Sequence, residues 1–398
     1  MPQRAVILSG SLGLGHDVVS DVVSASLAGL GWQARTLDCM ALLGPRAGRA
    51  GDWVFRRLMA RPGVFDGLHF AHLRTGSRLA TAMDHAATPR LVSALQGVLA
   101  DEPADMIISV FAAGVPAAAE LARCLPRPRT VVLCPDALPH ATWVREGIDL
   151  FLVTSAAGAA SVRRYAPRAR VAVVPPPVRS AFAHPPPRAA VRSALGVPAG
   201  ARCVLLMGGG WGLGPVEGAV RALAAAGVHV LAVAGHNRRL EARLQALAAS
   251  SPRVHPYGFT PDIPGLMSAC DLVVTLPGAL TCGEARVTGR RLMLVDAMPG
   301  HGRENVQHEL EQGGAEVCNP RPVDITRSVL AALDGPRSAG PGRPAADWEE
   351  AFAAALASIG AGPEHEPGTV AGRTAAAGGT AVIGGHPHDH STREVGFP

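Results

Sequence analysis

Polar side chains suited to proton transfer follow predicted strand ends in the first half of the chain. His16 comes after the glycines of SGSLGLGH at the start of a predicted helix, and Asp136 and His140 lie in PDALPHATW, directly after a predicted strand. Imidazole has an unperturbed pKa of about 6.5, so it can exchange protons near neutral pH. Because parallel strands end at one edge of a sheet, we expect these side chains and Trp143 to share one rim. The alternatives are an ordinary polar residue at a helix start and a structural histidine at position 140.

A second concentration of polar groups lies between Ala269 and Asn305. The run Leu272–Thr275 predicts a buried strand, and LPGAL then exposes backbone N–H groups before a helix that starts near Thr281. Glu284 stands three residues after that threonine, which fits either a capping box or a carboxylate held at the strand ends. The next predicted strand leads into a polar exit loop, MPGHGREN. Two successive strand ends with polar loops predict a ligand pocket, unless Glu284 only caps its helix.

Glycine-rich loops follow the first strand of each half. GGGWGLGP follows a strand predicted over 203–207 and precedes a helix predicted over 216–226, an arrangement in which backbone N–H groups and the helix dipole attract a diphosphate. It lacks the GK[ST] of a P-loop. In the first half, Gly13 and Gly15 partly match a dinucleotide fingerprint, but Val18 stands where its third glycine belongs. A nucleotide is therefore not expected at the first loop.

Length and periodicity predict that these loops belong to two α/β domains. With 398 residues, of which 48% are hydrophobic, the chain can bury two cores of ordinary size. The chain opens with a strand, helix and strand, and the second half repeats that plan. Strands are predicted over 4–9, 33–37, 104–109, 130–134, 148–153, 170–174, 203–207, 228–234, 272–275 and 291–295.

Composition narrows the class of protein further. The seven cysteines never form a CxxC pair, which favours reduced thiols over disulfides or zinc. No run of eighteen uncharged apolar residues occurs, and glycines interrupt the N-terminus too early for a signal peptide, so we expect a cytoplasmic protein. The net charge of +5 gives no indication of nucleic-acid binding. The last stretch, rich in Gly, Ala, Pro and His, predicts a disordered tail. Its HPHDH either binds metal weakly or is solvated.

Residues 45–90 carry the charge excess. They hold eight arginines and three aspartates, an excess of five that equals the net charge of the whole chain. Aromatic and aliphatic side chains are interleaved with the arginines, among them Trp53, Phe55, Arg56 and Arg57. Such a mixture is typical of a segment that lies on an anionic membrane surface. The alternative is an ordinary amphipathic helix that packs its apolar face on its own domain.

Several motifs together resemble one family. SGSLGLGH, PDALPHATW, PPPVRSAF, LLMGGGWGLGP, AGHN, YGF and TCGEA occur in the order and spacing of monogalactosyldiacylglycerol synthase-like glycosyltransferases, from about residue 4 to about residue 320. The family is related to the lipid II-forming peptidoglycan glycosyltransferase. The resemblance implies a GT-B architecture of two Rossmann-like α/β domains that face each other across a cleft, with a nucleotide-sugar donor in the C-terminal domain and a lipid acceptor near the N-terminal one.

The prolines after PPPVRSAF predict a stiff linker, and the resemblance implies the roles of the domains on either side of it. We expect an acceptor-binding domain over 1–183, a linker over 184–200, a nucleotide-sugar-binding domain over 201–335, a C-terminal helix over 336–359 and the tail over 360–398. His16 matches a histidine close to the reaction centre, and Asp136 the aspartate across the cleft. Glu284 matches the carboxylate expected to hold the ribose, and Asn305 matches the asparagine near the donor sugar. The expected donor side also comprises Gly208, Gly209, Gly210, Gly212, His236, Phe259, Gly278, Thr281 and His301. From the rim and the basic segment described above, we place Gly13, Gly15, His140, Trp143, Trp53, Phe55, Arg56 and Arg57 on the acceptor or membrane side.

Three departures from the family pattern concern the donor subsites. Leu276 stands where the family commonly has a basic residue, His301 and Gly302 replace a Gln-Glu pair, and Trp211 replaces an acidic residue in the glycine loop. These changes leave the donor sugar open and would also fit a degenerate transferase.

The expected function is an inverting, metal-independent and cofactor-free transfer of a hexose from a UDP-sugar to a lipid such as diacylglycerol. The expected place is the inner face of the plasma membrane. Two alternatives stay open, which are transfer to a soluble hydrophobic natural product and a catalytically inactive sugar-nucleotide-binding regulator.

Overall fold

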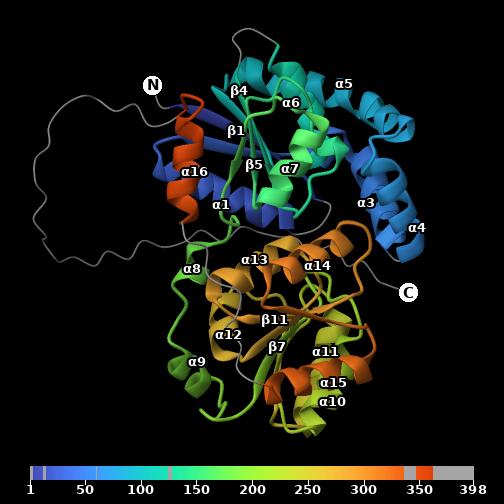
Figure 1. Cartoon of the computed structure of the whole chain (residues 1–398), viewed down its shortest axis with the longest axis vertical. Coiled ribbons are helices and arrows are strands. Elements are labelled where there is room, and N and C mark those ends of the chain that lie inside the picture. The colour runs from blue at the N-terminus through green and yellow to red at the C-terminus, as the bar shows by residue number, and fades with distance from the viewer. Residues whose placement is uncertain (1–2, 12–14, 60, 124–127, 336–346, 362–398) are drawn as a thin grey trace, which may run out of the picture. The chain divides into compact units, whose positions relative to one another are not determined.

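Two six-stranded parallel sheets organise the chain (Figure 1). The computed structural model describes residues 3–11, 15–59, 61–123, 128–335 and 347–361. The predicted tail, apart from Gly360 and Ala361, lies outside the described residues, and so does its HPHDH segment. The predicted α/β class with two parallel sheets is confirmed.

The first sheet has the strand order β2-β1-β3-β4-β5-β6, so the order reverses between β1 and β3. Its strands are β1 (Arg4–Ser9), β2 (Gln33–Asp38), β3 (Met106–Ser109), β4 (Arg129–Cys134), β5 (Leu150–Val153) and β6 (Val171–Val173). Ile7 pairs with Ile108 in the parallel register of β1 and β3. Ligands of open α/β sheets bind at such a reversal, outside the carboxyl ends of the strands. His16 follows β1, so the fold places it at this switch point.

The second sheet repeats the plan with the order β12-β11-β10-β7-β8-β9. Its strands are β7 (Cys203–Met207), β8 (His229–Val233), β9 (Val254–Tyr257), β10 (Leu272–Thr275), β11 (Arg291–Val295) and β12 (Ala315–Cys318). The order reverses between β7 and β10. The glycine loop after β7 and the helix after β10 therefore flank the second switch point.

Helices cover both faces of each sheet. In the first half these are α1 (Gly15–Gly29), α2 (Cys39–Leu42), α3 (Pro45–Met59), α4 (Pro62–Leu68), the π-helical turn η1 (His69–Leu73), α5 (Arg78–Asp101), the 3-10 turn η2 (Ala112–Gly114), α6 (Val115–Leu121), the 3-10 turn η3 (Ala141–Trp143) and α7 (Ala156–Tyr165). In the second half these are α8 (Ser180–Ala183), α9 (Arg188–Ala194), α10 (Val216–Ala225), α11 (Arg238–Ser250), α12 (Ile263–Ala269), α13 (Ala279–Thr288), α14 (His301–Gln312) and α15 (Pro322–Asp334).

The final helix, α16 (Trp348–Ala357), returns to the first sheet (Figure 1). Its Phe352 is buried in one core with Ile7 of β1 and Leu27 of α1. Trp348 Nε1 donates a hydrogen bond of 2.8 Å to Ser26 Oγ, which satisfies the only polar atom of a buried indole. The sequence predicted this helix but not where it packs.

Around the ligand pocket, the structure excludes one sequence-based alternative, the capping box, and corrects one expectation, the length of a loop. Helix α13 begins at Ala279, with the extended residue Gly278 as N-cap and no side-chain cap, so Thr281 and Glu284 do not form a capping box. The expected loop MPGHGREN is also partly helical, because α14 already begins at His301. Consequently His301 and Asn305 are held on a helix.

The basic segment folds into α3, α4, η1 and the first turns of α5, and it has two kinds of face. Phe65 and His69 are buried, as the packing alternative requires. Trp53, Val54, Val64 and Phe70 are exposed, and the Arg57 guanidinium lies 4.9 Å from the centre of the Trp53 ring. The side chains of Phe55 and Arg56 lie outside what the structure describes. Among the described residues, no helix is long and apolar enough to cross a membrane.

Candidate functional site

His16 stands in the first turn of α1 and has a defined tautomer. Its Nδ1 lies 2.8 Å from the carbonyl oxygen of Val110, just after β3. A carbonyl oxygen only accepts, so in the neutral ring Nδ1 carries the proton and Nε2 keeps its lone pair. Burial lowers the pKa of His16 from its ordinary value, and nearby Asp136 partly opposes this. The ring is therefore neutral at pH 7 and can accept a proton through Nε2.

The structure brings the predicted polar residues of the first half together and adds one from the second. Asp136 raises and His301 lowers the pKa of His16, so both lie within electrostatic reach of the ring. Burial, together with His69, lowers the pKa of His140 to about 3, against an opposing effect of Asp136. His16, Asp136, His140 and His301 thus form one cluster between the carboxyl ends of the two sheets.

Aromatic rings shape the floor of this cluster. The His16 ring meets Phe111 edge-on at 5.1 Å between centroids and lies 6.4 Å from Trp143. Trp143 is 2% exposed, and the His140 ring lies 6.3 Å from it. Trp143 is therefore a packing residue under both histidines. Gly15 is the first residue of α1, and Gly13 lies outside the described residues.

Asn305 joins the two halves of the chain. Its Oδ1 accepts a hydrogen bond of 3.1 Å from the backbone N–H of Ala137, and its Nδ2 donates one of 3.0 Å to the carbonyl of Pro277. The side chain is 2% exposed. The loop after β4, the LPGAL break and α14 are therefore fixed to one another by one amide, next to Asp136.

Two positions of the glycine loop after β7, Gly208 and Gly212, leave no room for a side chain. Gly212 has φ +58°, and a Cβ there would lie 2.4 Å from the carbonyl oxygen of Ala234. Gly208 is equally crowded, since a Cβ there would lie 2.5 Å from the carbonyl oxygen of Leu213. The amides of Gly212 and Leu213 donate within the loop. The earlier amides, at Gly209 and Gly210, are left as candidates for a diphosphate.

Two predicted donor-side residues form an aromatic platform. The rings of His236, after β8, and Phe259, after β9, stack at 4.2 Å with 14° between their planes. Phe259 is 62% exposed. The backbone N–H of His236 donates a hydrogen bond to the carbonyl oxygen of Gly210 in the glycine loop. A flat apolar ring at this edge suits stacking with a planar base.

Glu284 is a buried acid on α13. It is 7% exposed, and burial raises its pKa to about 8, with Arg179 exerting the opposite effect. Near pH 7 the group is therefore mainly the neutral carboxylic acid, which donates one hydrogen bond and accepts others. Arg179 belongs to PPPVRSAF but had no role in the sequence-based site. Its guanidinium also donates to the carbonyl of Pro261.

The remaining donor-side positions lie in or just before helices α13 and α14. Gly278 is the N-cap of α13, Thr281 stands partly exposed in its first turn, and Leu276 is buried in the core of the second sheet. At Gly302 a Cβ would lie 2.6 Å from the Cβ of Met298. A residue larger than glycine there would have to move Met298, so this departure from the family pattern is matched by local packing.

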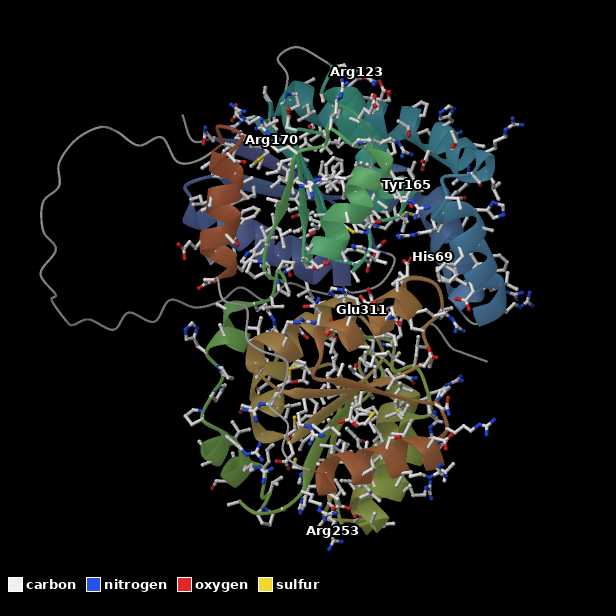
Figure 2. The ribbon with its side chains drawn as sticks, in the orientation of Figure 1. His69, Arg123, Tyr165, Arg170, Arg253 and Glu311 are labelled. Atoms are coloured by element: carbon white, nitrogen blue, oxygen red, sulfur yellow. The ribbon has the colours of Figure 1, made fainter. Side chains whose placement is uncertain are left out.

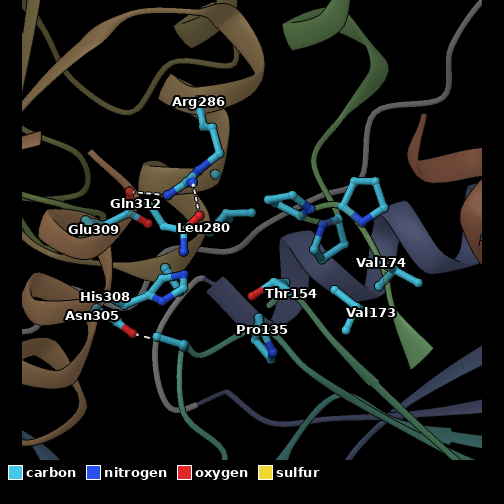
Figure 3. Close-up of a pocket in the computed structure, with 16 residues that line it drawn as sticks. Pro135, Thr154, Val173, Val174, Leu280, Arg286, Asn305, His308, Glu309 and Gln312 are labelled. Carbon is cyan, nitrogen blue, oxygen red and sulfur yellow. Dashed lines mark hydrogen bonds and ion pairs between the residues drawn. The ribbon is translucent and has the colours of Figure 1, made fainter. Parts of the chain in front are cut away.

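A cavity of about 360 Å³ adjoins Asn305 (Figure 3). One wall is polar, with Arg286, Glu309 and Gln312, and the other is formed by Val173, Val174 and the prolines that follow them. His308 also lines it and is 8% exposed. The cavity lies between the loops of the first sheet and helices α13 and α14, beside the histidine cluster.

Sequence reasoning missed a set of contacts between α4–η1 and α14. The residues are Asp66, His69 and Arg74 on one side and Gly300, Arg303 and Glu304 on the other. Figure 2 shows His69 next to the first turn of α14. The partners stand more than 200 residues apart in the chain, and no local motif marks them. Among the described residues, no group of three or more His, Cys, Asp or Glu side chains is arranged to hold a metal ion.

Comparison with known proteins supports the resemblance seen in the motifs. Residues 215–333 match the model of the glycosyltransferase family 28 C-terminal domain. Over 172 residues the chain is 35% identical to a probable chloroplastic monogalactosyldiacylglycerol synthase of Nicotiana tabacum, covering 40% of this chain and 31% of that protein. Over 198 residues it is 29% identical to a processive diacylglycerol beta-glucosyltransferase of Bacillus pumilus, covering 49% and 51%. The chain thus spans about a third to a half of these curated relatives.

Solved structures are similar over most of the chain. Acinetobacter baumannii MurG aligns with a TM-score of 0.54 and 16% identity, covering 84% of this chain and 91% of that one. A UDP-glucosyltransferase from Polygonum tinctorium aligns with a TM-score of 0.57 and 13% identity, covering 85% and 90%. At these identities the similarity shows the fold alone. The predicted GT-B fold is confirmed.

Proposed function

We propose that this protein is a glycosyltransferase that moves a hexose from a UDP-sugar to the hydroxyl group of a lipid such as diacylglycerol. The observation that carries the proposal is the neutral His16, whose Nε2 lone pair lies in a cluster with Asp136 and His301 between the two switch points. The names of the relatives support a lipid acceptor, since one is a monogalactosyldiacylglycerol synthase and the other a diacylglycerol glucosyltransferase.

The proposed reaction is a single displacement. The acceptor hydroxyl attacks the anomeric carbon, the bond from that carbon to the β-phosphate oxygen breaks, and UDP leaves with the electron pair. His16 Nε2 takes the acceptor proton, and Asp136 stabilises the imidazolium that forms. Attack from the face opposite the leaving group inverts the anomeric configuration.

The departing UDP acquires charge at its β-phosphate. We assign its stabilisation to the early amides of the glycine loop and to the first turn of α13, which are fixed dipoles and need no metal ion or other cofactor. Glu284 holds the ribose, and the ring pair of His236 and Phe259 stacks on the base.

Exposed apolar and basic side chains on α3, α4 and η1 support action at an anionic membrane surface. Trp53, Val54, Val64 and Phe70 supply the apolar part, and Arg57 is among the exposed cations. We place the protein in the cytoplasm, on the inner face of the plasma membrane, with a nucleotide sugar, a lipid and anionic lipid surface as partners and no nucleic acid.

Release of UDP tests the proposal. Purified protein is mixed with UDP-glucose, UDP-galactose or UDP-N-acetylglucosamine and with vesicles that contain diacylglycerol, and lipid products are identified by mass spectrometry. UDP release that requires both a donor and diacylglycerol is expected. UDP binding without turnover on vesicles or on soluble phenols would show instead an inactive sugar-nucleotide-binding protein. Turnover on the phenols alone would show a natural-product transferase.

A further inference from the structure

Helix α14 is held at its first turn by residues of the basic segment. Asp66 Oδ1 accepts a hydrogen bond of 2.6 Å from the N–H of Gly300, and Asp66 Oδ2 accepts one of 2.9 Å from Arg303 Nε. Glu304 accepts a hydrogen bond of 3.1 Å from His69 Nε2 and forms an ion pair with Arg74 Nε at 3.3 Å. We name these five side chains and Gly300 the α14 clamp.

The centre of the clamp is Glu304, and its surroundings are largely dry. The side chain of Glu304 is 11% exposed, that of His69 1% and that of Arg74 19%. An ion pair withdrawn from water, such as that of Glu304 with Arg74, is costly to break at one partner, because the remaining charge stays buried. Removing one partner of the clamp should therefore cost more than removing one partner of an exposed ion pair.

Shape reinforces the charges at Gly300. This residue has φ +64°, and a Cβ there would lie 2.4 Å from the ring of Phe65. The Phe65 ring also meets His301 at 6.3 Å, edge to face. The first turn of α14 is thus fitted against α4 by a glycine that admits an aromatic ring.

The clamp leads directly to the histidine cluster. The His69 ring lies 5.5 Å from that of His140 and 6.4 Å from that of His301. Arg74, which pairs with Glu304, also donates to the carbonyls of Leu138 and Pro139 in the loop that carries Asp136. One carboxylate therefore fixes the loop of Asp136 and the helix of His301 together.

We infer that Glu304 is a positioning residue for the transfer step, which it serves by holding the first turn of α14, and with it His301, against His16 and Asp136. The inference rests on the proposed function. Glu304 reaches the reaction only through these neighbours, so its loss should misalign the site while the donor still binds. Misplacement by about 1 Å can cost up to roughly a hundredfold in rate.

Glu304→Gln tests this role, because it keeps the shape and removes the charge. Its kcat should fall about tenfold while KM for the donor and Kd for UDP stay within about twofold. Glu304→Asp, which keeps the charge, should recover part of the rate. The matched control is Glu311→Gln on the same helix, since Glu311 is exposed and accepts a hydrogen bond from Gln307 within α14 (Figure 2). Unchanged kcat in Glu304→Gln, or an equal loss in Glu311→Gln, would overturn the role.

A double-mutant cycle separates positioning from general structural support. If Glu304 acts through the proton-transfer step, Glu304→Gln should lower turnover little further when His16 is already Ala. Fully additive losses in a normally folded double variant would contradict the inference.

Hydrogen exchange tests the clamp without relying on activity. If the wild type transfers no hexose, the proposed function is overturned, but the clamp can still be tested in this way. Amides of residues 62–74 and 300–308 should exchange faster together in Glu304→Gln and in Asp66→Asn than in Glu311→Gln. Unchanged exchange in both segments would show that the clamp does not hold α14.

Discussion

At the scale of single residues, His16 and Asp136 divide the roles in proton transfer. His16→Ala should lower turnover at least a hundredfold, because general-base catalysis contributes about 10²–10⁴-fold, while UDP still binds to the other domain. Asp136→Asn should also be slow, because it no longer stabilises the imidazolium. Rates of UDP release and calorimetric UDP affinities check both. Full turnover in His16→Ala with none in Asp136→Asn would make the aspartate the base.

The decrease of kcat at acidic pH should come from protonation of His16. Burial lowers the pKa of His16, so the base stays unprotonated below pH 6.5. The rate should therefore begin to fall only below that pH. Measuring kcat between pH 5 and pH 8 checks this, and a midpoint above pH 6.5 would contradict it.

Glu284 supports a prediction about the donor. Glu284→Ala should weaken UDP binding at least tenfold, because it removes hydrogen bonds worth roughly 1.5–3 kcal/mol. Glu284→Gln should retain most of the affinity, since the folded protein presents a neutral acid near pH 7. Calorimetry at pH 7 compares the three proteins. Equal affinity of wild type and Glu284→Ala would remove Glu284 from the donor site.

Local sequence identified these residues because each follows a strand end, and parallel strands end together. It did not identify Asp66, His69 or Glu304, because their partners come from the other half of the chain. The capping-box alternative for Thr281 and Glu284 failed because Gly278 already provides the extended N-cap residue of α13, three positions before Thr281.

At the scale of elements, the glycine loop offers a matched pair of variants. In Gly212→Ala the new Cβ would clash with the Ala234 carbonyl, and the positive φ would also be unfavourable. In Gly209→Ala only the φ of +68° is unfavourable, because the space around the Cβ is open. The φ penalty alone is about 1–2 kcal/mol. Gly212→Ala should therefore lower both the melting temperature and UDP affinity more than Gly209→Ala. Calorimetry and thermal unfolding measure both, and equal effects would show that the crowding at Gly212 relaxes at no cost.

Helix α3 and its neighbours should dock on anionic bilayers. Each arginine near such a surface contributes about 1 kcal/mol, so replacing Arg46, Arg49 and Arg57 by Gln should abolish most co-sedimentation with anionic vesicles. Arg253→Gln is the control, because Arg253 is exposed in the loop before β9 (Figure 2). Binding of the wild type should fall as salt rises. Equal binding of the wild type to neutral and to anionic vesicles would contradict an electrostatic contribution of these arginines.

Elements were predictable where periodicity marks them. Most strands lie within a few residues of their expected bounds, because β-branched and apolar runs are local signals. Strand β12 and the start of α14 were missed. The segment before α14 is rich in Gly and Pro, which does not predict a helix. Helix α14 is instead fixed by tertiary hydrogen bonds, from Gly300 to Asp66 and from Asn305 to Ala137 and Pro277.

At the scale of the whole molecule, buried titratable groups tie stability to pH in two directions. The folded pKa of His140 is lowered to about 3, so the unfolded chain binds more protons once the pH falls below 6.5, and stability declines. The folded pKa of Glu284 is raised to about 8 from an ordinary value of 4.5. Its contribution is therefore complete below pH 4.5 and is lost as the pH rises toward 8.

Glu284→Gln isolates the second effect, because Gln does not titrate. Between pH 6.5 and 8 the free energy of unfolding of the wild type should decrease relative to that of Glu284→Gln by up to about 1.4 kcal/mol per pH unit, the limit for one proton. Urea unfolding at intervals of half a pH unit measures this difference in unfolding free energy. Saturating UDP should reduce the difference if the ribose forms hydrogen bonds with the Glu284 carboxyl group. Parallel curves for the two ligand-free proteins would mean that Glu284 ionises normally in the folded chain, and the ribose would then meet a carboxylate.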